Sequence, residues 1–200
     1  MTTFDERAPE WDSPERVERA AHVAAAIREA VALGPGIRAI EIGAGTGLLG
    51  LALAADVGSL VLADASAGML AEADAKIAAS GLANVRTLRL DLTTDPLPAE
   101  RFDLVVSLMA LHHVPDTAAA LAELVALTEP GGWLALVDLD AEDGTFHSDP
   151  DAQVHHGFGR EALAAAAESA GYRDVAFRTV LEMAKNDRAY PLFLMTARRS

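Results

Sequence analysis

The clearest candidate for ligand chemistry in this chain is one glycine-rich segment: Glu41, Ile42, Gly43, Ala44, Gly45, Thr46 and Gly47. Glycine lets the backbone turn sharply and approach a ligand closely, and a helix that begins there offers free amide groups. A dinucleotide fingerprint needs its third glycine three residues after the second, where this chain has Leu48. The third glycine here comes one residue earlier, so the spacing disfavours a nicotinamide cofactor. A structural turn between a strand and a helix is the plainer alternative.

Two aspartates follow the apolar runs that come next along the chain. Asp64 stands about 20 residues beyond the glycines, where a carboxylate of a doubly wound fold can accept hydrogen bonds from two ribose hydroxyls. This role suits a nicotinamide cofactor as well as another nucleoside. Asp91 stands directly after the third apolar run. Either aspartate can instead cap a helix or a turn, because Asp favours such positions.

The elements that must position these residues alternate regularly. Ser13 and Pro14 begin a first helix, Ser66 caps another that Gly81 closes, and Asp116 caps a third. Short apolar runs indicate strands at residues 39–42, 59–63, 85–90, 102–108 and 133–139, with a helix at 48–55 after the glycines. Strands that alternate with helices imply right-handed crossovers and a parallel sheet.

The last part of the chain breaks this alternation. A helix from Arg160 to Gly171 is followed by two strand-like runs, 175–181 and 192–197, which suggest a closing hairpin. The sequence therefore predicts an α/β fold: a doubly wound, mostly parallel seven-stranded sheet with helices on both faces and a C-terminal antiparallel hairpin. We expect a single domain over residues 1–200, with an irregular loop at 140–159.

Composition excludes several classes of function. The chain has no cysteine, which removes disulfides, thiolate metal sites and a cysteine nucleophile. Its net charge of -14 disfavours binding to nucleic acid. No apolar run approaches the ~20 residues needed to span a membrane, and residues 1–10 lack the apolar core of a secretory signal. We therefore expect a cytoplasmic protein without a nucleic-acid or membrane partner.

Several segments together resemble a known family. The glycine spacing with the leading Glu41 resembles motif I of class I S-adenosylmethionine-dependent methyltransferases, whose loop wraps the methionine and ribose parts of the cofactor. Residues 102–109 resemble motif IV of that family, and residues 111–116 are similar to a loop that runs beside the acceptor in small-molecule members. Residues 138–147 and 155–158 resemble one branch of small methyltransferases. The resemblance runs from Trp11 to the final strand.

The resemblance implies a Rossmann-like methyltransferase fold, S-adenosylmethionine as cofactor, S-adenosylhomocysteine as product, and methyl transfer to an O, N or C atom of a small molecule. Asp91 would receive the exocyclic amine of adenine, with the Leu92 amide at the ring edge. Nucleic-acid adenine methyltransferases carry two prolines and an aromatic residue where this chain has Leu108, Met109 and Ala110. The cofactor-binding residues expected are Glu41, Gly43, Ala44, Gly45, Gly47, Asp64, Ala65, Met69, Asp91, Leu92 and Ser107. The alternatives are an NAD(P)-dependent oxidoreductase and a non-catalytic cofactor-binding protein of the same fold.

The histidines raise the question of a general base. An alcohol, phenol or acidic carbon must lose a proton before it is methylated, and histidine suits that task near neutral pH. His22 lies within the first helix, whereas the other five histidines fall on loops expected at the carboxyl ends of the strands. We take His113 and His156 as candidate catalytic residues. Trp11 and the helix at 13–33 are candidates for a lid, although Trp11 suits a packing role equally well.

A metal site is a further alternative for the irregular loop. Imidazole and carboxylate groups are competent metal ligands. No helical pair spaced four residues apart fixes a geometry for them, so we expect no metal. The groups concerned are His147, His155 and His156 with Asp140, Glu142, Asp143, Asp149 and Asp151.

Overall fold

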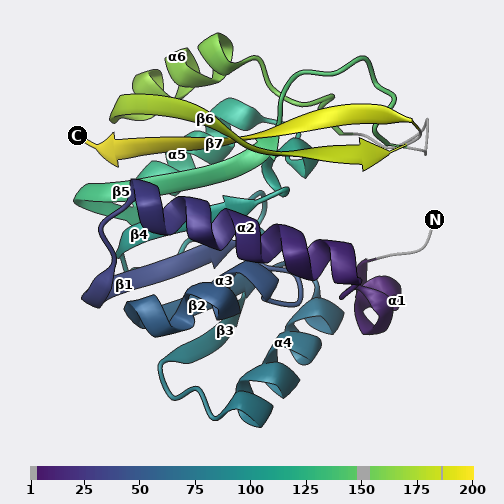
Figure 1. Ribbon diagram of the computed structural model, residues 1–200. Coiled ribbons are helices and arrows are strands. Elements are labelled where there is room, and N and C mark those ends of the chain that lie inside the picture. Colours follow the sequence, from purple (N-terminus) through teal and green to yellow (C-terminus); the bar gives the residue numbers. More distant parts are fainter. Residues whose placement is uncertain (1–3, 148–153, 186) are drawn as a thin grey trace.

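The computed structural model describes residues 4–147, 154–185 and 187–200 (Figure 1). A seven-stranded sheet has the order β3-β2-β1-β4-β5-β7-β6. Neighbours among β1 to β5 are parallel, and β7 runs antiparallel to both β5 and β6. This confirms the predicted mostly parallel sheet with a C-terminal hairpin. The strands are β1 (Gly34–Ile42), β2 (Val57–Asp64), β3 (Val85–Arg89), β4 (Phe102–Leu108), β5 (Thr128–Leu139), β6 (Tyr172–Lys185) and β7 (Arg188–Arg199).

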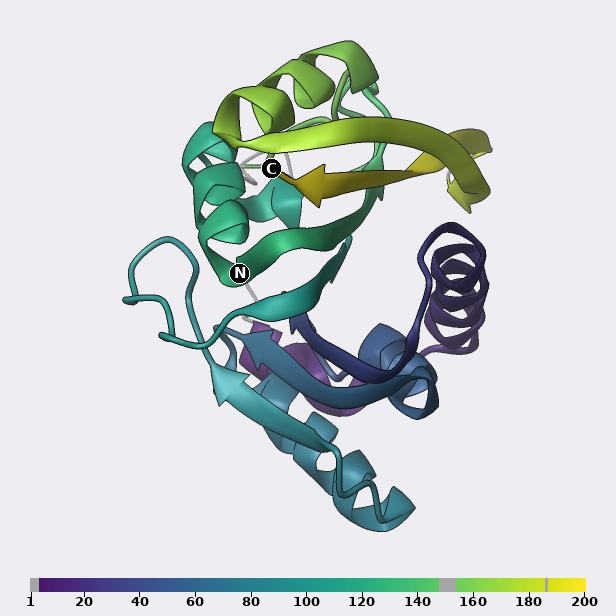
Figure 2. The same cartoon turned by 90° about the vertical axis from the view of Figure 1, so that its left-hand side faces the viewer.

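Helices cover both faces of the sheet, as predicted (Figure 2). One apolar layer is formed with α2, α3 and α4, and the other with α5 and α6. None of the helices in the described part of the chain is long and apolar enough to cross a membrane. The helices are α1 (Phe4–Arg7), α2 (Pro14–Ala30), α3 (Leu48–Leu53), α4 (Ala67–Ser80), α5 (Thr117–Leu127) and α6 (Arg160–Ala170), with 3-10 turns η1 (Ala8–Glu10), η2 (Ala54–Asp56) and η3 (Leu111–His113).

The predicted helix starts are confirmed in atomic detail. The Ser13 and Ser66 hydroxyls accept hydrogen bonds from the third amide of α2 and α4, and the Asp116 carboxylate does the same for α5. Gly81 ends α4 in the left-handed region, with φ of 64°. These caps depend on residues within one helical turn, which is why sequence alone locates them.

Several element bounds differ from the prediction. β1 begins at Gly34 and β5 at Thr128, five residues before the apolar runs, and both extensions pair through register shifts. β6 and β7 are longer than their apolar cores because partners in the hairpin satisfy each other's backbone groups. The helix expected at 48–55 ends at Leu53 and continues as a 3-10 turn. Apolar periodicity marks the buried centre of a strand and not its ends.

The helix predicted at 13–33, which is α2 in the structure, packs as part of the core. Val23, Ala24 and Ile27 of α2 are fully buried in the apolar layer on one sheet face. Only its first turns, at Arg16, Arg19 and Ala20, reach the large pocket described below. The lid role expected for this helix stays a prediction, and the segment that crosses the pocket is the short stretch before it.

Candidate functional site

A pocket of about 810 Å³ opens at the carboxyl ends of the parallel strands. Its lining includes the loops after β1, β2, β3 and β4, together with the N-terminal segment and the end of β6. The chain leaves β1 toward β2 on one side and continues at β4 on the other, so the strand order reverses there. Ligands of open α/β sheets bind at such switch points, and the volume suits a drug-sized molecule.

The glycine loop has a backbone that only glycine adopts easily. Gly43, Gly45 and Gly47 have φ of 68°, 53° and 81°. A Cβ added at Gly43 would overlap the Cβ of Ala110, which lies in the loop after β4. Gly43 and Gly45 line the pocket as expected, whereas Gly47 lies outside its lining and serves as the N-cap of α3. The sequence therefore located the loop. Two of its three glycines line the pocket, and Gly47 begins the helix that follows the loop.

Glu41 stabilises this loop from within the core. Its side chain is 2% exposed, and its Oε2 accepts a hydrogen bond of 2.8 Å from the Gly50 amide in α3. Burial raises the pKa of Glu41 to about 8, although the Gly50 amide opposes this. The carboxyl group is accordingly largely protonated at neutral pH. It lines the inner wall of the pocket and joins β1 to the helix that follows the loop.

The two predicted aspartates lie in the pocket and also brace the turns around it. Asp64 Oδ2 accepts from the Gly45 amide at 2.7 Å, and its Oδ1 accepts from the Ser66 amide at 2.8 Å. Asp91 Oδ1 accepts from the amide and hydroxyl of Thr93, and these bonds lower the pKa of Asp91. The binding and turn-forming interpretations are therefore compatible, because a carboxylate has lone pairs for both.

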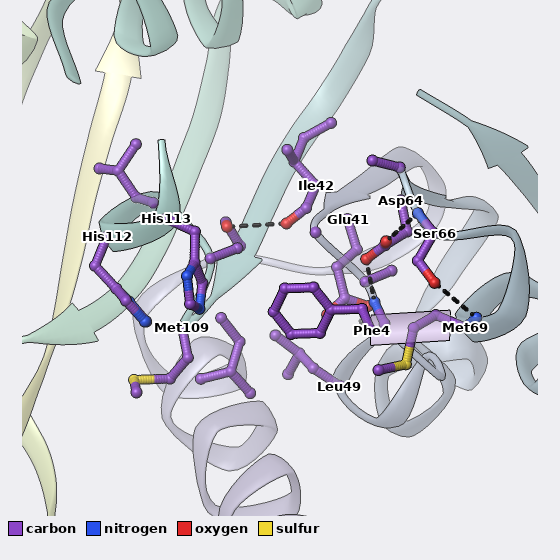
Figure 3. A pocket seen from close by; sticks show the side chains of 18 of the residues that line it. Phe4, Glu41, Ile42, Leu49, Asp64, Ser66, Met69, Met109, His112 and His113 are labelled. Atoms are coloured by element: carbon purple, nitrogen blue, oxygen red, sulfur yellow. Dashed lines mark hydrogen bonds between the residues drawn. The ribbon is translucent and has the colours of Figure 1, made fainter. Parts of the chain in front are cut away.

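The other expected cofactor residues are brought to the same place. Ala44, Ala65, Met69, Leu92 and Ser107 all line the pocket. The Ser107 hydroxyl donates to the Ile42 carbonyl at 2.9 Å, so it ties β4 to β1. Figure 3 shows the Asp64, Ser66 and Met69 side of the pocket facing the His112 and His113 side. The binding roles of these residues stay predictions.

The N-terminal segment 4–12 crosses the pocket. The Asp5 carboxylate accepts from the Ser66 hydroxyl and the Gly68 amide at the start of α4. The Phe4 ring lies between the Glu41 side and the His113 side in Figure 3, and it packs edge-on against both Trp11 and His113. Trp11, the predicted lid residue, lines the pocket beneath the guanidinium groups of Arg7 and Arg16.

A buried histidine–aspartate contact that the sequence analysis missed lies on the opposite side. His112 Nδ1 is 2.7 Å from Asp138 Oδ1, and both side chains are at most 2% exposed. Asp138 Oδ2 also accepts from the His112 amide. These residues follow or end the neighbouring parallel strands β4 and β5. The sequence did contain a signal for this pair. His112 follows the predicted strand 102–108, and Asp138 lies at the end of the next predicted strand, 133–139.

Two further imidazoles, those of His113 and His147, lie beside this pair. The His112 ring centroid is 4.1 Å from that of His113 and 5.1 Å from that of His147. His113 is exposed by its surface area and lines the pocket, although many protein atoms lie around its ring. This burial, with repulsion from His112 and His147, lowers the pKa of His113 to about 4. Burial and the same kind of repulsion lower the pKa of His147.

The remaining loop histidines do not reach the pocket. His155 Nε2 lies 3.0 Å from the Val114 carbonyl and holds the turn before α5. His156, the second candidate base, is exposed and lies against Gly144 outside the pocket lining. A bridge between Asp140 and Phe158 and a hydrogen bond from the Glu142 amide to the His156 carbonyl hold His156 beside the residues that follow β5.

The metal alternative finds no support in the part of the chain that the structure describes. No group of three or more histidine, aspartate or glutamate side chains there could hold a metal ion. Asp140 is paired with Arg160 and Asp143 with Arg188, so neither faces the histidine cluster as a free ligand. Asp149 and Asp151, which that alternative included, lie outside the described residues.

Comparisons with known proteins agree with this geometry. A family model described as a methyltransferase domain matches residues 39–132. An uncharacterized methyltransferase of Mycobacterium tuberculosis is 41% identical over 98 residues, which are 49% of this chain and 48% of that relative. The match thus spans about half the length of that relative. A demethylmenaquinone methyltransferase of Mycolicibacterium vanbaalenii is 30% identical over 181 residues, covering 78% of this chain and 76% of that protein.

A solved structure extends the likeness to the whole fold. The crystal structure of an S-adenosylmethionine-dependent methyltransferase from Aquifex aeolicus superimposes with a TM-score of 0.75 at 21% identity, covering 98% of each chain. The glycine loop, Asp64 and Asp91 lie within the matched residues 39–132. These findings favour a methyltransferase over a nicotinamide-dependent oxidoreductase, the alternative that the strand, glycine loop and Asp64 had left open. The chain belongs to the class I S-adenosylmethionine-dependent methyltransferases.

Proposed function

We propose that this chain transfers a methyl group from S-adenosylmethionine to a small-molecule acceptor. The observation that carries the proposal is the pairing of two unlike walls in one pocket. The glycine loop, bonded through Gly45 to Asp64, faces the His112–Asp138 pair across the pocket. One wall suits a nucleoside and the other suits a group that has to lose a proton.

The donor wall would hold S-adenosylmethionine through hydrogen bonds of three kinds. Asp64 keeps lone pairs for ribose hydroxyls, and Asp91 with the Leu92 amide suits the edge of adenine. Gly43 and Gly45 allow close approach of the backbone. When bound, the cofactor supplies a methyl group on a sulfonium, which is already an activated leaving group. The protein then has to align the acceptor and exclude water.

The acceptor wall favours a general base other than His113 and His156, the two candidates from the sequence. His113 has a low pKa and is therefore a weak base. Asp138 holds Nδ1 of His112 and fixes the orientation of its ring, so Nε2 of His112 is the atom we assign to receive the acceptor's proton. This arrangement favours an acceptor with a hydroxyl or an acidic carbon. His156 has no role in it, because it lies outside the pocket lining.

The rest of that wall suits an aromatic acceptor. Phe4, Met109, Phe146 and Met183 line the pocket near the histidines. Flat rings pack well against aromatic and thioether groups. The similarity to a protein named demethylmenaquinone methyltransferase adds support for an aromatic acceptor.

Calorimetry and turnover test the proposal in sequence. S-adenosylhomocysteine should bind and raise the melting temperature, since a ligand that binds only the folded state stabilises it. Release of S-adenosylhomocysteine should then be measured with phenolic, carboxylic and amine acceptors. No heat and no thermal shift with S-adenosylhomocysteine would remove the proposal. Binding without turnover on any acceptor would favour the non-catalytic alternative, which keeps the fold and the cofactor.

A further inference from the structure

Cationic side chains gather at one end of the pocket, although the chain is strongly acidic. The sequence has 30 acidic and 16 basic residues. The acidic side chains Glu41, Asp64 and Asp91 lie after or within β1, β2 and β3, on one half of the sheet. Arg19 on α2 and Lys185 at the end of β6 line the other end. Arg19 and Lys185 thus add positive charge at the acceptor end of the pocket.

Arg19 is held there without a carboxylate partner among the described residues. Its Nη1 donates to the Met183 sulfur at 3.2 Å, and a thioether is a weak acceptor for a guanidinium group. Burial, together with repulsion from Arg16, lowers the pKa of Arg19. A partly desolvated guanidinium with only sulfur beside it is costly unless an anion completes its hydrogen bonds.

Lys185 is brought to the same place by the pleat of β6. Met183 and Lys185 are two residues apart on this strand, so their side chains share a face. The Lys185 ammonium donates to the Phe146 carbonyl and lies 4.7 Å from the centre of the Phe146 ring. Its charge contributes to the lowered pKa of His147, which places it beside the histidine cluster. Figure 1 shows the start of α2 and the tip of the β6–β7 hairpin on one side of the molecule.

Arg16 belongs to the other end of the pocket. It stacks 4.2 Å above the Trp11 ring, and the Trp11 side chain lies next to Gly45 of the glycine loop. Its Nη1 donates to the Trp11 carbonyl. Arg16 therefore faces the donor, whereas Arg19 and Lys185 face the aromatic and histidine wall.

We propose that Arg19 and Lys185 form an anion subsite, and that the methyl acceptor carries a carboxylate or phosphate group bound there. The inference rests on the proposed function, because it names the acceptor class of the same pocket. Arg19 would offer a planar pair of N–H donors and Lys185 a mobile point charge. The anion would neutralise both cations and direct the far end of the acceptor toward His112.

Binding of simple probes to the S-adenosylhomocysteine complex tests the subsite. We would titrate benzoate, phenyl phosphate and neutral benzamide into wild type and into Arg19→Gln, Lys185→Gln and Arg28→Gln. Arg28→Gln removes the same charge from α2 at a site paired with Asp56 outside the pocket. We expect an anion to bind about tenfold more tightly than benzamide, and each pocket variant to lose about tenfold for the anion alone. The anion that binds more tightly shows whether the subsite prefers a carboxylate or a phosphate.

Several results would overturn the subsite. Equal binding of benzoate, phenyl phosphate and benzamide would do so, as would anion affinity that survives in both pocket variants. Weaker S-adenosylhomocysteine binding in Arg19→Gln, with anion preference intact, would assign the cation to the donor's own carboxylate. Arg19→Lys should keep part of the anion affinity, which separates loss of charge from misfolding. Anion preference without S-adenosylhomocysteine binding would sink the proposed function and leave the subsite standing.

Discussion

The two ends of the pocket are built in different ways. The donor end is made from one short segment, the glycine loop, with carboxylates that follow neighbouring strands β1, β2 and β3. The acceptor end brings together α2, η3, β5 and β6, which are distant in the sequence. Arg19 and Met183, for example, are 164 residues apart and in contact. Backbone chemistry dominates the donor end, and long side chains dominate the acceptor end.

This difference separates recognition of a common cofactor from recognition of a particular acceptor. A loop whose φ angles favour glycine tolerates little change, and a Cβ added at Gly43 or Gly47 would also lie 2.3 or 2.7 Å from a neighbouring side chain. Side chains on a helix start and a hairpin tip can be exchanged without disturbing the sheet. Substitutions at the two ends should therefore have separable effects on donor binding and on turnover.

The largest effect is expected at Gly43. Gly43→Ala places a Cβ on that of Ala110 at a positive φ, so the loop has to move. We expect the affinity for S-adenosylhomocysteine to fall by at least about 100-fold in calorimetry. Gly36→Ala, whose added Cβ meets nothing within 4 Å, is the matched control and should bind normally. Unchanged affinity in Gly43→Ala would place the donor away from this loop.

At the acceptor end, Asp138→Asn should reduce turnover and spare donor binding. The substitution keeps the shape of the side chain but removes the carboxylate that contacts Nδ1 of His112 and orients its ring. We expect kcat to fall about 100-fold, while the affinity for S-adenosylhomocysteine stays that of wild type. His156→Gln should leave kcat unchanged, since His156 lies outside the pocket lining. A loss of kcat in His156→Gln alone would restore the base predicted from sequence.

Asp64→Ala should weaken donor binding by about 1 to 3 kcal/mol, because buried ribose hydroxyls would lose their acceptor. The variant also removes the bond to the Gly45 amide. Calorimetry with S-adenosylhomocysteine measures the change, and Asp74→Asn on the outer side of α4, bonded to Thr87, serves as control. If Asp64→Ala binds as wild type does, the ribose lies elsewhere.

The most specific effect is a pH dependence of stability from Glu41. Its folded pKa of about 8 lies above the unfolded value near 4.5, so the folded state binds more protons between these values. Stability from this group is complete below about pH 4.5 and is lost as pH rises toward 8. Glu41→Gln keeps an oxygen for the Gly50 amide and should gain stability, relative to wild type, on the order of a few kcal/mol at pH 8.

Urea unfolding at pH 5 and pH 8 measures this difference. Glu18→Gln, which removes an exposed carboxylate from α2, is the control. Its free energy of unfolding should change between pH 5 and pH 8 as that of wild type does. If wild type and Glu41→Gln lose the same stability between the two pH values, Glu41 is charged in the folded protein and does not hold the loop as a neutral acid.

Sequence alone determined the features that depend on neighbouring residues. Helix caps at Ser13, Ser66 and Asp116, the glycine loop, and the order of strands and helices all follow from contacts within one or two turns of chain. Asp64 and Asp91 were found for the same reason, since each ends a recognisable strand. Their common location then follows from the rule that parallel strands end at one edge.

Only the tertiary structure decided which side chains share the acceptor end of the pocket. The His112–Asp138 pair depends on β4 and β5 being neighbours, and the contact of Arg19 with Met183 depends on the packing of α2 against β6. His156, a candidate base from the sequence, lies outside the pocket lining, and its catalytic role stays a prediction. Such contacts depend on packing between distant segments, and local spacing carries no information about them.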